Sequence, residues 1–388
     1  MNTYDWIVVG GGLTGAALGY ELQKQGLRVL LLEPDSTIAN ATRYSYGGLA
    51  YWAGTSPLTR QLCEEGIAVH RQLSQELDAD TQFREFETLL TIEPEEDPDT
   101  VATDYNRFAL PARRLTPSEA NEIEPLLNPN AISGALLLPH GHIEPQQTNR
   151  AYLQAFGRAG GVLQPEEVTG FAYNGDRAVG VKTAEGTYFA EHIAICAGGL
   201  SRALLQKCGI PVKLYFTQTE ILETPPVEEL RLQTLVMPAI IDRFELEEKA
   251  IQPEFEPLWK RESGEPVPPI LDAGAIQFRD RHFILGQLSR AIANPHFTPD
   301  AAASEAKIRD AIANIFPSLA PLPATWHRCL VAYAANSLPL VGALAGIEGL
   351  HLFSGFTNTL LFAPPLAKHF ARWAAGETGT LLEQLQSY

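Results

Sequence analysis

The chain has 388 residues, more than a single hydrophobic core usually serves, so we expect two structural domains. Its 29 Lys and Arg against 46 Asp and Glu give a net charge of −17, which repels phosphate backbones and argues against a nucleic-acid partner. The sequence also has no apolar stretch long enough to span a bilayer, and its four cysteines form no CxxC pair, so it predicts no transmembrane segment, no metal site and no disulfide framework.

The N-terminal segment predicts a βαβ unit. Residues 4–9 are an apolar run typical of a buried parallel strand. Residues 14–25 carry Leu18 and Leu22 one turn apart and predict a helix, and residues 28–33 predict a second strand. Because the first strand starts almost at once, we expect no signal peptide and a cytoplasmic location.

The turn after the first strand has the pattern GxGxxG, formed by Gly10, Gly12 and Gly15, with Leu13 and Thr14 between the last two. The first glycine allows a tight turn, the second lets the backbone approach a pyrophosphate, and the third lets helix and strand pack closely. The N–H groups at the start of the helix favour a phosphate there. This turn predicts dinucleotide binding.

Glu33, followed by Pro34, ends the second strand and is placed to accept hydrogen bonds from ribose hydroxyls. The alternative interpretation is a glycine-rich turn in an unrelated α/β domain. Strand, helix, second strand and acid in register favour the dinucleotide site, although the motif alone does not separate NAD from FAD.

Further along, the chain alternates between strand-like and helical segments. We expect a functional loop at 39–54, helices at 57–77 and 148–159, a hairpin from 179–181 and 187–190, and a buried strand at 193–199. Strand-like pieces at 213–222 and 282–285 flank a Pro-rich, charged insertion at 225–269, which predicts either a lid or a dimer contact. A strand at 350–353 and a helix at 361–375 end the chain. These elements predict an α/β fold with a discontinuous nucleotide-binding domain (1–80, 145–210 and 330–388) and a mainly antiparallel substrate domain (81–144 and 211–329).

Several motifs in a fixed order resemble the D-amino acid oxidase-like family of FAD-dependent oxidoreductases, which includes glycine oxidase and sarcosine oxidase. The resemblance covers nearly the full length, and the existence of only one glycine motif also favours FAD over NAD. Its parts are the glycine motif with Glu33, the loop from Thr42-Arg43 to Gly47-Gly48, residues 141–145 before a helix, Val168, Ala197-Gly198, residues 338–342 and Gly355.

The resemblance implies a Rossmann-type FAD-binding domain with a second, mainly antiparallel β-sheet substrate domain. It places Thr42 and Arg43 near the pyrophosphate, the Val168 backbone at the adenine, and the segment after Gly355 against the pyrimidine side of the flavin. The alternative interpretation of that segment is a C-terminal helix that only packs against the core, and the two interpretations are compatible. The expected cofactor-binding residues are Gly10, Gly12, Leu13, Thr14, Gly15, Glu33, Pro34, Thr42, Arg43, Gly47, Gly48, Val168, Ala197, Gly198, Cys329, Gly355, Thr357, Asn358, Thr359 and Leu360.

The substrate pocket departs from the family pattern. Amino acid oxidases of this family carry an arginine five residues before an aspartate, and here these positions are Val331 and Asn336. Val331 cannot offer the guanidinium fork that usually binds a carboxylate. Cys329, Val331 and Tyr333 would project from one face of a strand toward the flavin. The pocket candidates are Tyr333, Val331 and Tyr51.

Other side chains are candidates for the pocket. An aromatic cluster either covers the flavin ring or packs between the domains. Arginines elsewhere could replace the missing guanidinium, although surface charge is their alternative role. The aromatic residues are Tyr44, Tyr46, Tyr51 and Trp52, and the arginines are Arg279, Arg281 and Arg290.

The expected function is oxidation of a C–N bond of an amine or amino acid derivative by hydride transfer to flavin N5, with a small-molecule substrate and with oxygen or another electron acceptor. The same scaffold serves oxidation of a 2-hydroxy acid, and loss of the carboxylate arginine also fits a flavin-binding protein without catalysis. The sequence leaves the oligomeric state open.

Cys329 stands where the sarcosine oxidase branch carries the cysteine that forms a thioether with the flavin. Neighbouring His327 and Arg328 favour a thiolate, the nucleophile that such a bond requires. The favoured alternative is a small, buried packing residue, with FAD held non-covalently.

Overall fold

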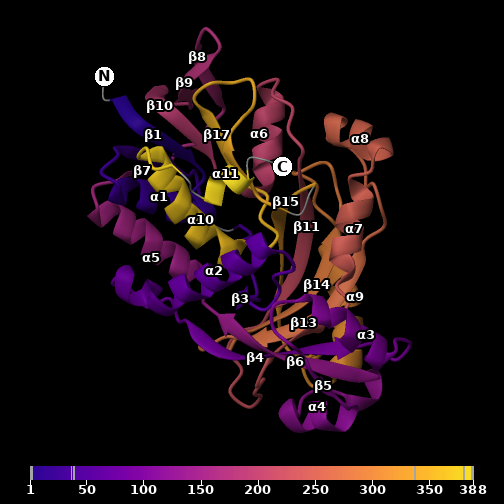
Figure 1. Ribbon diagram of the computed structural model, residues 1–388. Coiled ribbons are helices and arrows are strands. Elements are labelled where there is room, and N and C mark those ends of the chain that lie inside the picture. The colour runs from indigo at the N-terminus through magenta and orange to yellow at the C-terminus, as the bar shows by residue number, and fades with distance from the viewer. Residues whose placement is uncertain (1–2, 36, 38–39, 336–337, 379–380, 386–388) are drawn as a thin grey trace.

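Two β-sheets organise the computed structural model, which describes residues 3–35, 37, 40–335, 338–378 and 381–385 (Figure 1). The first sheet carries the expected βαβ unit, and most strand pairs of the second are antiparallel. The predicted fold class, an α/β protein with a Rossmann-type unit and a second, mainly antiparallel sheet, is confirmed.

The first sheet is built on β1 (Thr3–Val9), which pairs in parallel with β2 (Val29–Leu32) and with β10 (Thr187–Ile195). α1 (Leu13–Lys24) connects β1 with β2. All four residues of β2 are buried, as expected for a parallel strand covered on both faces. β10 pairs in parallel with β17 (Leu350–Ser354), which brings the C-terminal segment beside the glycine motif. The other strands of this sheet are β7 (Val162–Gln164), β8 (Gly170–Asn174), β9 (Arg177–Lys182) and β16 (Leu340–Ala343).

Among the described residues, five helices share a core with one face of this sheet, and α11 (Leu381–Leu385) is the last of them in the chain. α1 packs between α10 (Thr359–Ala374) and α5 (Pro145–Arg158), and α2 (Pro57–Glu76) packs on α10 (Figure 1). α5 begins three residues before the predicted start because Glu144 caps it, with a side chain that accepts hydrogen bonds from the first backbone N–H groups. The remaining helices of four residues or more in the described chain are α3 (Pro98–Asp104), α4 (Pro117–Ile123), α6 (Ser201–Lys207), α7 (Asp242–Ala250), α8 (Glu256–Arg261) and α9 (Ala301–Ile315).

The second sheet has the strand order β15-β11-β14-β13-β12-β4-β6-β3, with β5 paired to β6. Its pairs are antiparallel except for β12 with β4. The strands are β3 (Gly48–Leu49), β4 (Arg84–Ile92), β5 (Arg113–Leu115), β6 (Gly134–His142), β11 (Leu214–Glu223), β12 (Leu235–Pro238), β13 (Ile270–Gln277), β14 (Phe283–Arg290) and β15 (Thr325–Ala334).

The apolar stretch of the insertion at 225–269 forms β12, a strand inside the second sheet between β13 and β4. Val236 is fully buried there. Helices α7 and α8 follow β12 along the chain, within the insertion. A lid or a dimer contact stays a prediction for the insertion.

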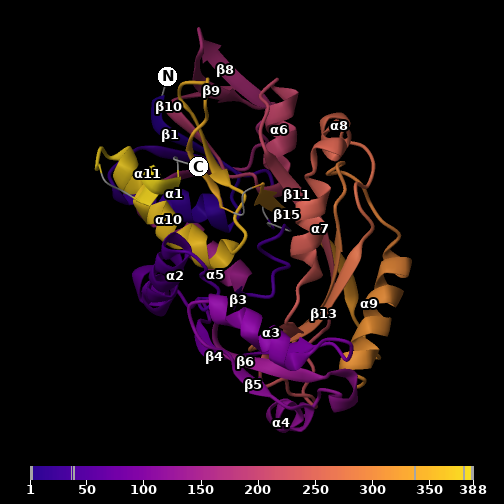
Figure 2. The ribbon, with the colours of Figure 1, turned by 45° about the vertical axis from the view of Figure 1, so that its right-hand side comes forward.

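Helices α7 and α9 cover opposite faces of the second sheet (Figure 2). On α9, Ile308 and Ile312 pack into a core with Leu222 of β11. On α7, Leu246 packs into a different core with Tyr215 and Tyr333. α7 therefore occupies the face of this sheet that looks toward the first sheet and its helices (Figure 2).

The domain boundaries stay a prediction. All strands of the first sheet fall within 1–80, 145–210 and 330–388, whereas β3 and the end of β15 join the second sheet from those same segments. No described helix combines the length and apolar composition needed to cross a bilayer.

Candidate active site

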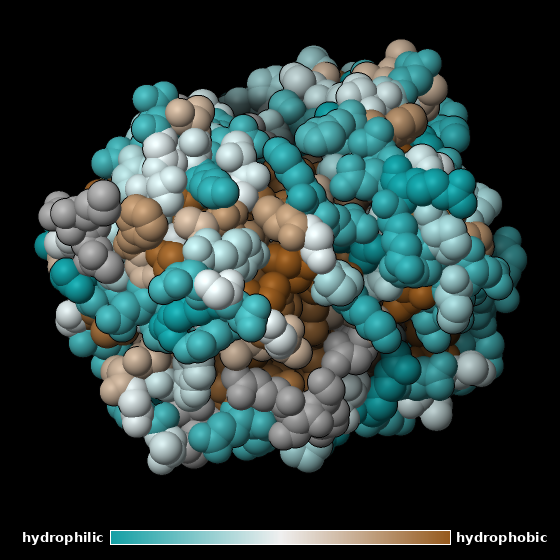
Figure 3. Space-filling view, turned by 90° about the horizontal axis from the view of Figure 1, so that it is seen from above, coloured by the Kyte–Doolittle hydropathy of each residue, from teal (hydrophilic) through white to brown (hydrophobic). Residues whose placement is uncertain are grey.

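A cavity of about 2660 Å³ lies between the two sheets. Val9 and Leu32, at the carboxyl ends of β1 and β2, line one end, and Thr219 of β11 and Glu247 of α7 line another part. Pockets for a single small ligand usually measure roughly 300–1,000 Å³, so this cavity has room for a dinucleotide and a small substrate together. Seen from above, the molecule has apolar side chains at the bottom of a hollow surrounded by polar ones (Figure 3).

The glycine motif forms one end of the cavity. Gly10 adopts φ +105°, and a Cβ on it would lie 2.6 Å from the Cys196 carbonyl oxygen, so only glycine fits. A Cβ on Gly15 would lie 1.9 Å from the Gly10 carbonyl oxygen, which explains the close approach of helix to strand. Gly10 and Gly12 line the cavity, whereas Gly15 is not among its lining residues. The three glycines thus have the separate geometries that the motif predicts.

Glu33 and Thr42 brace this loop. The Glu33 carboxylate accepts hydrogen bonds from the backbone N–H groups of Gly11 (2.7 Å) and Asp35 (3.0 Å). Thr42 Oγ1 accepts a hydrogen bond from the Leu13 N–H at the start of α1 (3.1 Å). Each carboxylate oxygen has a further lone pair, so Glu33 can still accept a hydroxyl at the cavity wall that it lines.

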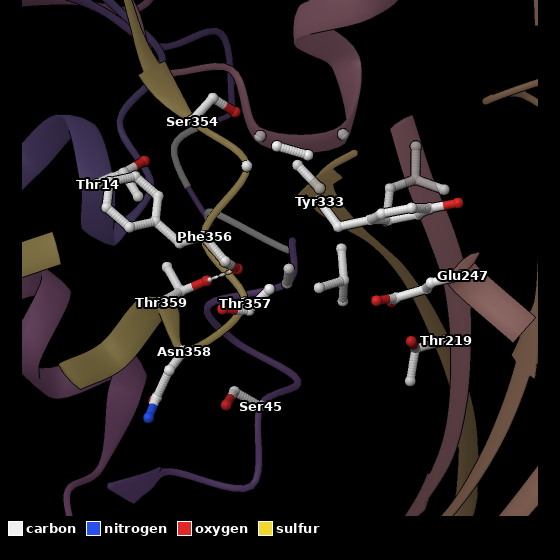
Figure 4. A pocket seen from close by; sticks show the side chains of 18 of the residues that line it. Thr14, Ser45, Thr219, Glu247, Tyr333, Ser354, Phe356, Thr357, Asn358 and Thr359 are labelled. Atoms are coloured by element: carbon white, nitrogen blue, oxygen red, sulfur yellow. Dashed lines mark hydrogen bonds between the residues drawn. The ribbon is translucent and has the colours of Figure 1, made fainter. Parts of the chain in front are cut away.

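The start of α10 forms a second part of the wall. Gly355 has φ +77°, and the chain then turns through Phe356 into the helix, which begins at Thr359. Thr357, Asn358 and Thr359 lie along this turn, and the Thr359 hydroxyl donates to the Phe356 carbonyl oxygen at 3.1 Å (Figure 4). The positive end of the helix dipole therefore lies at the cavity, as the sequence predicts.

β15 and β11 form the facing wall, across the cavity from that turn (Figure 4). In the antiparallel register Cys329 stands opposite Thr219, Val331 opposite Thr217, and Tyr333 opposite Tyr215. These three β15 residues line the cavity, and so do the residues between them, Leu330 and Ala332, so the lining is not confined to one face of the strand.

Cys329 is buried in the cavity wall, in keeping with its favoured interpretation as a small packing residue. Burial raises the pKa of the Cys329 thiol to about 12, and the positive charges of Arg243 and Arg328 only partly offset this. His327 is turned away to another partner, with its Nε2 3.2 Å from a carboxylate oxygen of Glu223. Arg328 thus lowers this pKa less than burial raises it, and His327 is paired with Glu223.

Most predicted cofactor residues meet at this one cavity, and four predicted site residues do not. Arg43 pairs instead with Glu223 at 2.6 Å, and Gly47 packs against the Ile143 carbonyl oxygen. Gly15 packs inside the motif, and Tyr51 is absent from the lining, although Tyr44, Tyr46 and Trp52 line it. Asn336 lies outside the described residues. The predicted residues that line the cavity are Gly10, Gly12, Leu13, Thr14, Glu33, Pro34, Thr42, Gly48, Val168, Ala197, Gly198, Cys329, Val331, Tyr333, Gly355, Thr357, Asn358, Thr359 and Leu360.

The sequence analysis missed the charged residues of α7. Arg243 and Glu247 line the cavity, whereas the arginines considered from sequence do not: Arg279 donates to the Phe83 carbonyl oxygen, and Arg290 pairs with Glu220. The i,i+4 spacing of Arg243 and Glu247 is typical of any exposed helix, so no local signal distinguished it.

A model of the family described as FAD dependent oxidoreductase matches residues 5–373. The chain belongs to the FAD-dependent oxidoreductase family. The match includes both sheets, and it confirms the family that the ordered motifs indicated.

Relatives in this family differ in length from the present chain. It is 24% identical over 396 residues to 4-methylaminobutanoate oxidase (formaldehyde-forming) of Paenarthrobacter nicotinovorans, covering 96% of this chain and 44% of that protein. It is 29% identical over 226 residues to glycine oxidase of Geobacillus kaustophilus, covering 55% of this chain and 59% of that protein. The chain thus spans about half the length of these curated relatives.

Solved structures share the fold. The crystal structure of glycine oxidase from Geobacillus kaustophilus superposes with a TM-score of 0.78 at 21% identity, covering 98% of this chain and 97% of that one. L-proline dehydrogenase from P. horikoshii gives a TM-score of 0.74 at 20% identity, covering 98% and 96%. At these identities the likeness establishes the architecture alone.

The residues at the glycine motif fit the family's cofactor. Gly12 lines the cavity at the start of α1, and a Cβ on it would make only ordinary contacts, 3.4 Å from Asn40 Nδ2 and from Thr42 Oγ1. A pyrophosphate there would meet helix N–H groups, and a ribose beside it would meet Glu33. The residues present at this turn therefore fit the family's dinucleotide.

Proposed function

We propose that the protein is an FAD-dependent oxidoreductase that oxidises a C–N bond of an amine or amino acid derivative. The observation that carries the proposal is the continuity of one cavity, from the glycine motif and Glu33 to the wall formed by Cys329, Val331 and Tyr333. The names of several relatives support it: 4-methylaminobutanoate oxidase, glycine oxidase and dimethylglycine dehydrogenase all denote enzymes acting on amines.

Each part of the cavity has a role in this proposal. When bound, FAD supplies the acceptor that takes a hydride from the substrate carbon. Gly10, Gly12, Glu33 and Thr42 hold the nucleotide end. The start of α10 holds the other end with its N–H groups and dipole. The wall of β15 and β11 orients the substrate and keeps water from it, because apolar and small side chains dominate there.

Anaerobic reduction of the flavin tests the reaction class. The purified holoenzyme is titrated with glycine, N-methylglycine, N,N-dimethylglycine and 4-methylaminobutanoate, and loss of visible flavin absorbance is followed. At least one of these amines is expected to bleach the flavin. Admitting air afterwards distinguishes oxygen from another carrier as the acceptor, because only an oxidase regains its colour rapidly.

Oxidation of a C–O bond is the second candidate. It is favoured by the 30% identity over 185 residues to a component of the anaerobic glycerol-3-phosphate dehydrogenase of Escherichia coli, which covers 46% of this chain and 33% of that protein. Lactate and glycerol 3-phosphate therefore belong in the same titration. Bleaching by one of these alcohols and by none of the amines would replace the leading proposal. A flavin that no member of either set reduces would favour a binding protein without catalysis.

The flavin is expected to be non-covalent. Cys329 is buried, and its raised thiol pKa of about 12 leaves little thiolate at neutral pH. Acid precipitation of the wild-type holoenzyme should leave the yellow colour in the supernatant. Yellow colour that stays with the wild-type pellet, and moves to the supernatant in Cys329→Ala, would instead establish the thioether.

A further inference from the structure

Helix α7 presents an arginine and a glutamate to the cavity. Arg243 and Glu247 are one turn apart, and both line the cavity with side chains that are only 15% and 8% exposed. Arg243 Nη1 lies 3.7 Å from Glu247 Oε1, an ion pair longer than a hydrogen bond. Glu247 Oε1 also accepts a hydrogen bond from Thr217 Oγ1 at 2.9 Å, which ties the pair to β11.

The donors of Arg243 are incompletely used. Its Nε is buried and finds no hydrogen-bond partner among the described residues. A buried guanidinium is costly unless an anion and hydrogen-bond acceptors satisfy it. Because Glu247 shares its oxygen with Thr217, Arg243 can accept a further anion from the cavity. A carboxylate matches the planar fork of its donors.

The strand register places this pair over the substrate wall. Thr217, which holds Glu247, stands directly opposite Val331, and the neighbouring pair on the same face is Tyr215 with Tyr333. Glu247 extends from α7 into the cavity, and it lies beside Tyr333 and Thr219 (Figure 4). Val331 stands where amino acid oxidases of this family carry an arginine. α7 thus brings a guanidinium to the strand face from which that arginine is missing.

We propose that Arg243 determines substrate specificity by binding the carboxylate of an amino-acid-derived substrate, and that Glu247 and Thr217 position its guanidinium. The inference rests on the proposed function for the identity of the substrate, and it narrows that substrate to amines that carry a carboxylate. α7 comes from the insertion at 225–269, so the insertion contributes to recognition as well as to the sheet.

Burial of Glu247 agrees with this arrangement. Burial raises the pKa of its carboxyl, while the charge of Arg243 and the Thr217 hydrogen bond lower it in opposition. Loss of the Arg243 charge would raise the pKa of Glu247 further, and also that of the buried Asp272 carboxyl, whose pKa the Arg243 charge lowers. Circular dichroism and the flavin content of Arg243→Met check that the variant folds and carries FAD.

Calorimetric binding to the holoenzyme tests the proposal without requiring turnover. The probes are pyrrole-2-carboxylate and pyrrole-2-carboxamide, which have the same ring and differ in charge. Wild type is expected to bind the carboxylate about 10- to 100-fold more tightly than the amide, and Arg243→Met to remove that preference. Arg243→Lys keeps the positive charge but lacks the planar fork of donors, so it should retain only part of the preference for the carboxylate.

Arg328→Met is the matched control, since Arg328 also lines the cavity but is partly exposed on β15 and donates to Thr298. It should keep the carboxylate preference. Equal binding of the two probes by wild type, or an unchanged preference in both Arg243 variants, would overturn the proposal. If Arg243 governs carboxylate binding while no amine reduces the flavin, the proposed function fails and this inference stands.

Discussion

Replacing Gly12 by valine is expected to give folded protein that retains almost no FAD. Gly12 has φ −63° and ψ 179°, a conformation open to any residue, and a Cβ there meets nothing closer than 3.4 Å. The backbone therefore accepts a side chain here, and the valine methyl groups would enter the cavity beside Asn40 and Thr42, where we place the pyrophosphate. The ratio of flavin to protein absorbance after purification measures the effect, and circular dichroism checks the fold.

Substitutions at two other glycines serve as controls for Gly12→Val. A Cβ on Gly157 in α5 would meet no atom within 4 Å, so Gly157→Val should keep the parental flavin content. Gly15→Val should fail to fold, because its Cβ would lie 1.9 Å from the Gly10 carbonyl oxygen. A yellow Gly12→Val protein with the parental flavin content would show that the cofactor is not placed at this turn.

Glu223→Gln is expected to lower the free energy of unfolding by about 3 kcal/mol at pH 7. Burial alone would raise the pKa of Glu223, but hydrogen bonds from His327 and Arg43, together with the Arg43 charge, outweigh it and lower the pKa from 4.5 to about 2. The carboxylate, 14% exposed, joins Arg43 in the loop after the glycine motif to His327 on β15. Its loss would release that loop from the second sheet.

The pH dependence has a definite sign. A carboxyl whose pKa is lower in the folded state stabilises the protein above its unfolded pKa and loses that effect as pH falls through the folded value. The difference between wild type and Glu223→Gln should thus be full above about pH 5 and shrink as pH falls from 4.5 toward 2. Urea unfolding at pH 7 and at pH 3.5 measures it.

Glu85→Gln provides the matched control for this substitution. Glu85 pairs with Arg71 at 2.7 Å, but the two side chains are 41% and 49% exposed. Solvent screens such a pair, so a loss below about 1 kcal/mol is expected at both pH values. Unfolding curves of Glu223→Gln that match those of Glu85→Gln would contradict the buried network.

Local sequence was enough to predict the turn geometry at the proposed nucleotide end of the site. The glycine motif, the helix behind it and Glu33 lie within one short stretch, and their roles follow from backbone sterics and helix-end donors that need no distant partner. The same is true of Gly355 before α10, where a positive φ precedes a helix start. On β15 the cavity wall includes Cys329, Val331 and Tyr333 but also the residues between them, which alternation along one strand does not predict.

The substrate end depended on contacts between segments far apart in the chain. The family resemblance placed Arg43 near the pyrophosphate, but Arg43 forms an ion pair with Glu223 instead. An ion pair between segments so far apart in the chain cannot be predicted from the local sequence. In the sequence, Arg243 and Glu247 look like ordinary charges on a helix surface. Only the placement of α7 against β11 and β15 in the structure brings them to the cavity.

By itself, then, the sequence determined the βαβ unit, the conformation of its glycine turn and the family, because glycine conformations and strand and helix periodicity act between near neighbours. Only the tertiary structure decided which charged groups face the substrate space, that the apolar part of the insertion at 225–269 is a strand of the sheet, and that the Cys329 thiol is buried. Burial, ion pairing and the pKa of a side chain depend on what the rest of the fold packs against it, and that is set by strand register and helix placement across the whole chain.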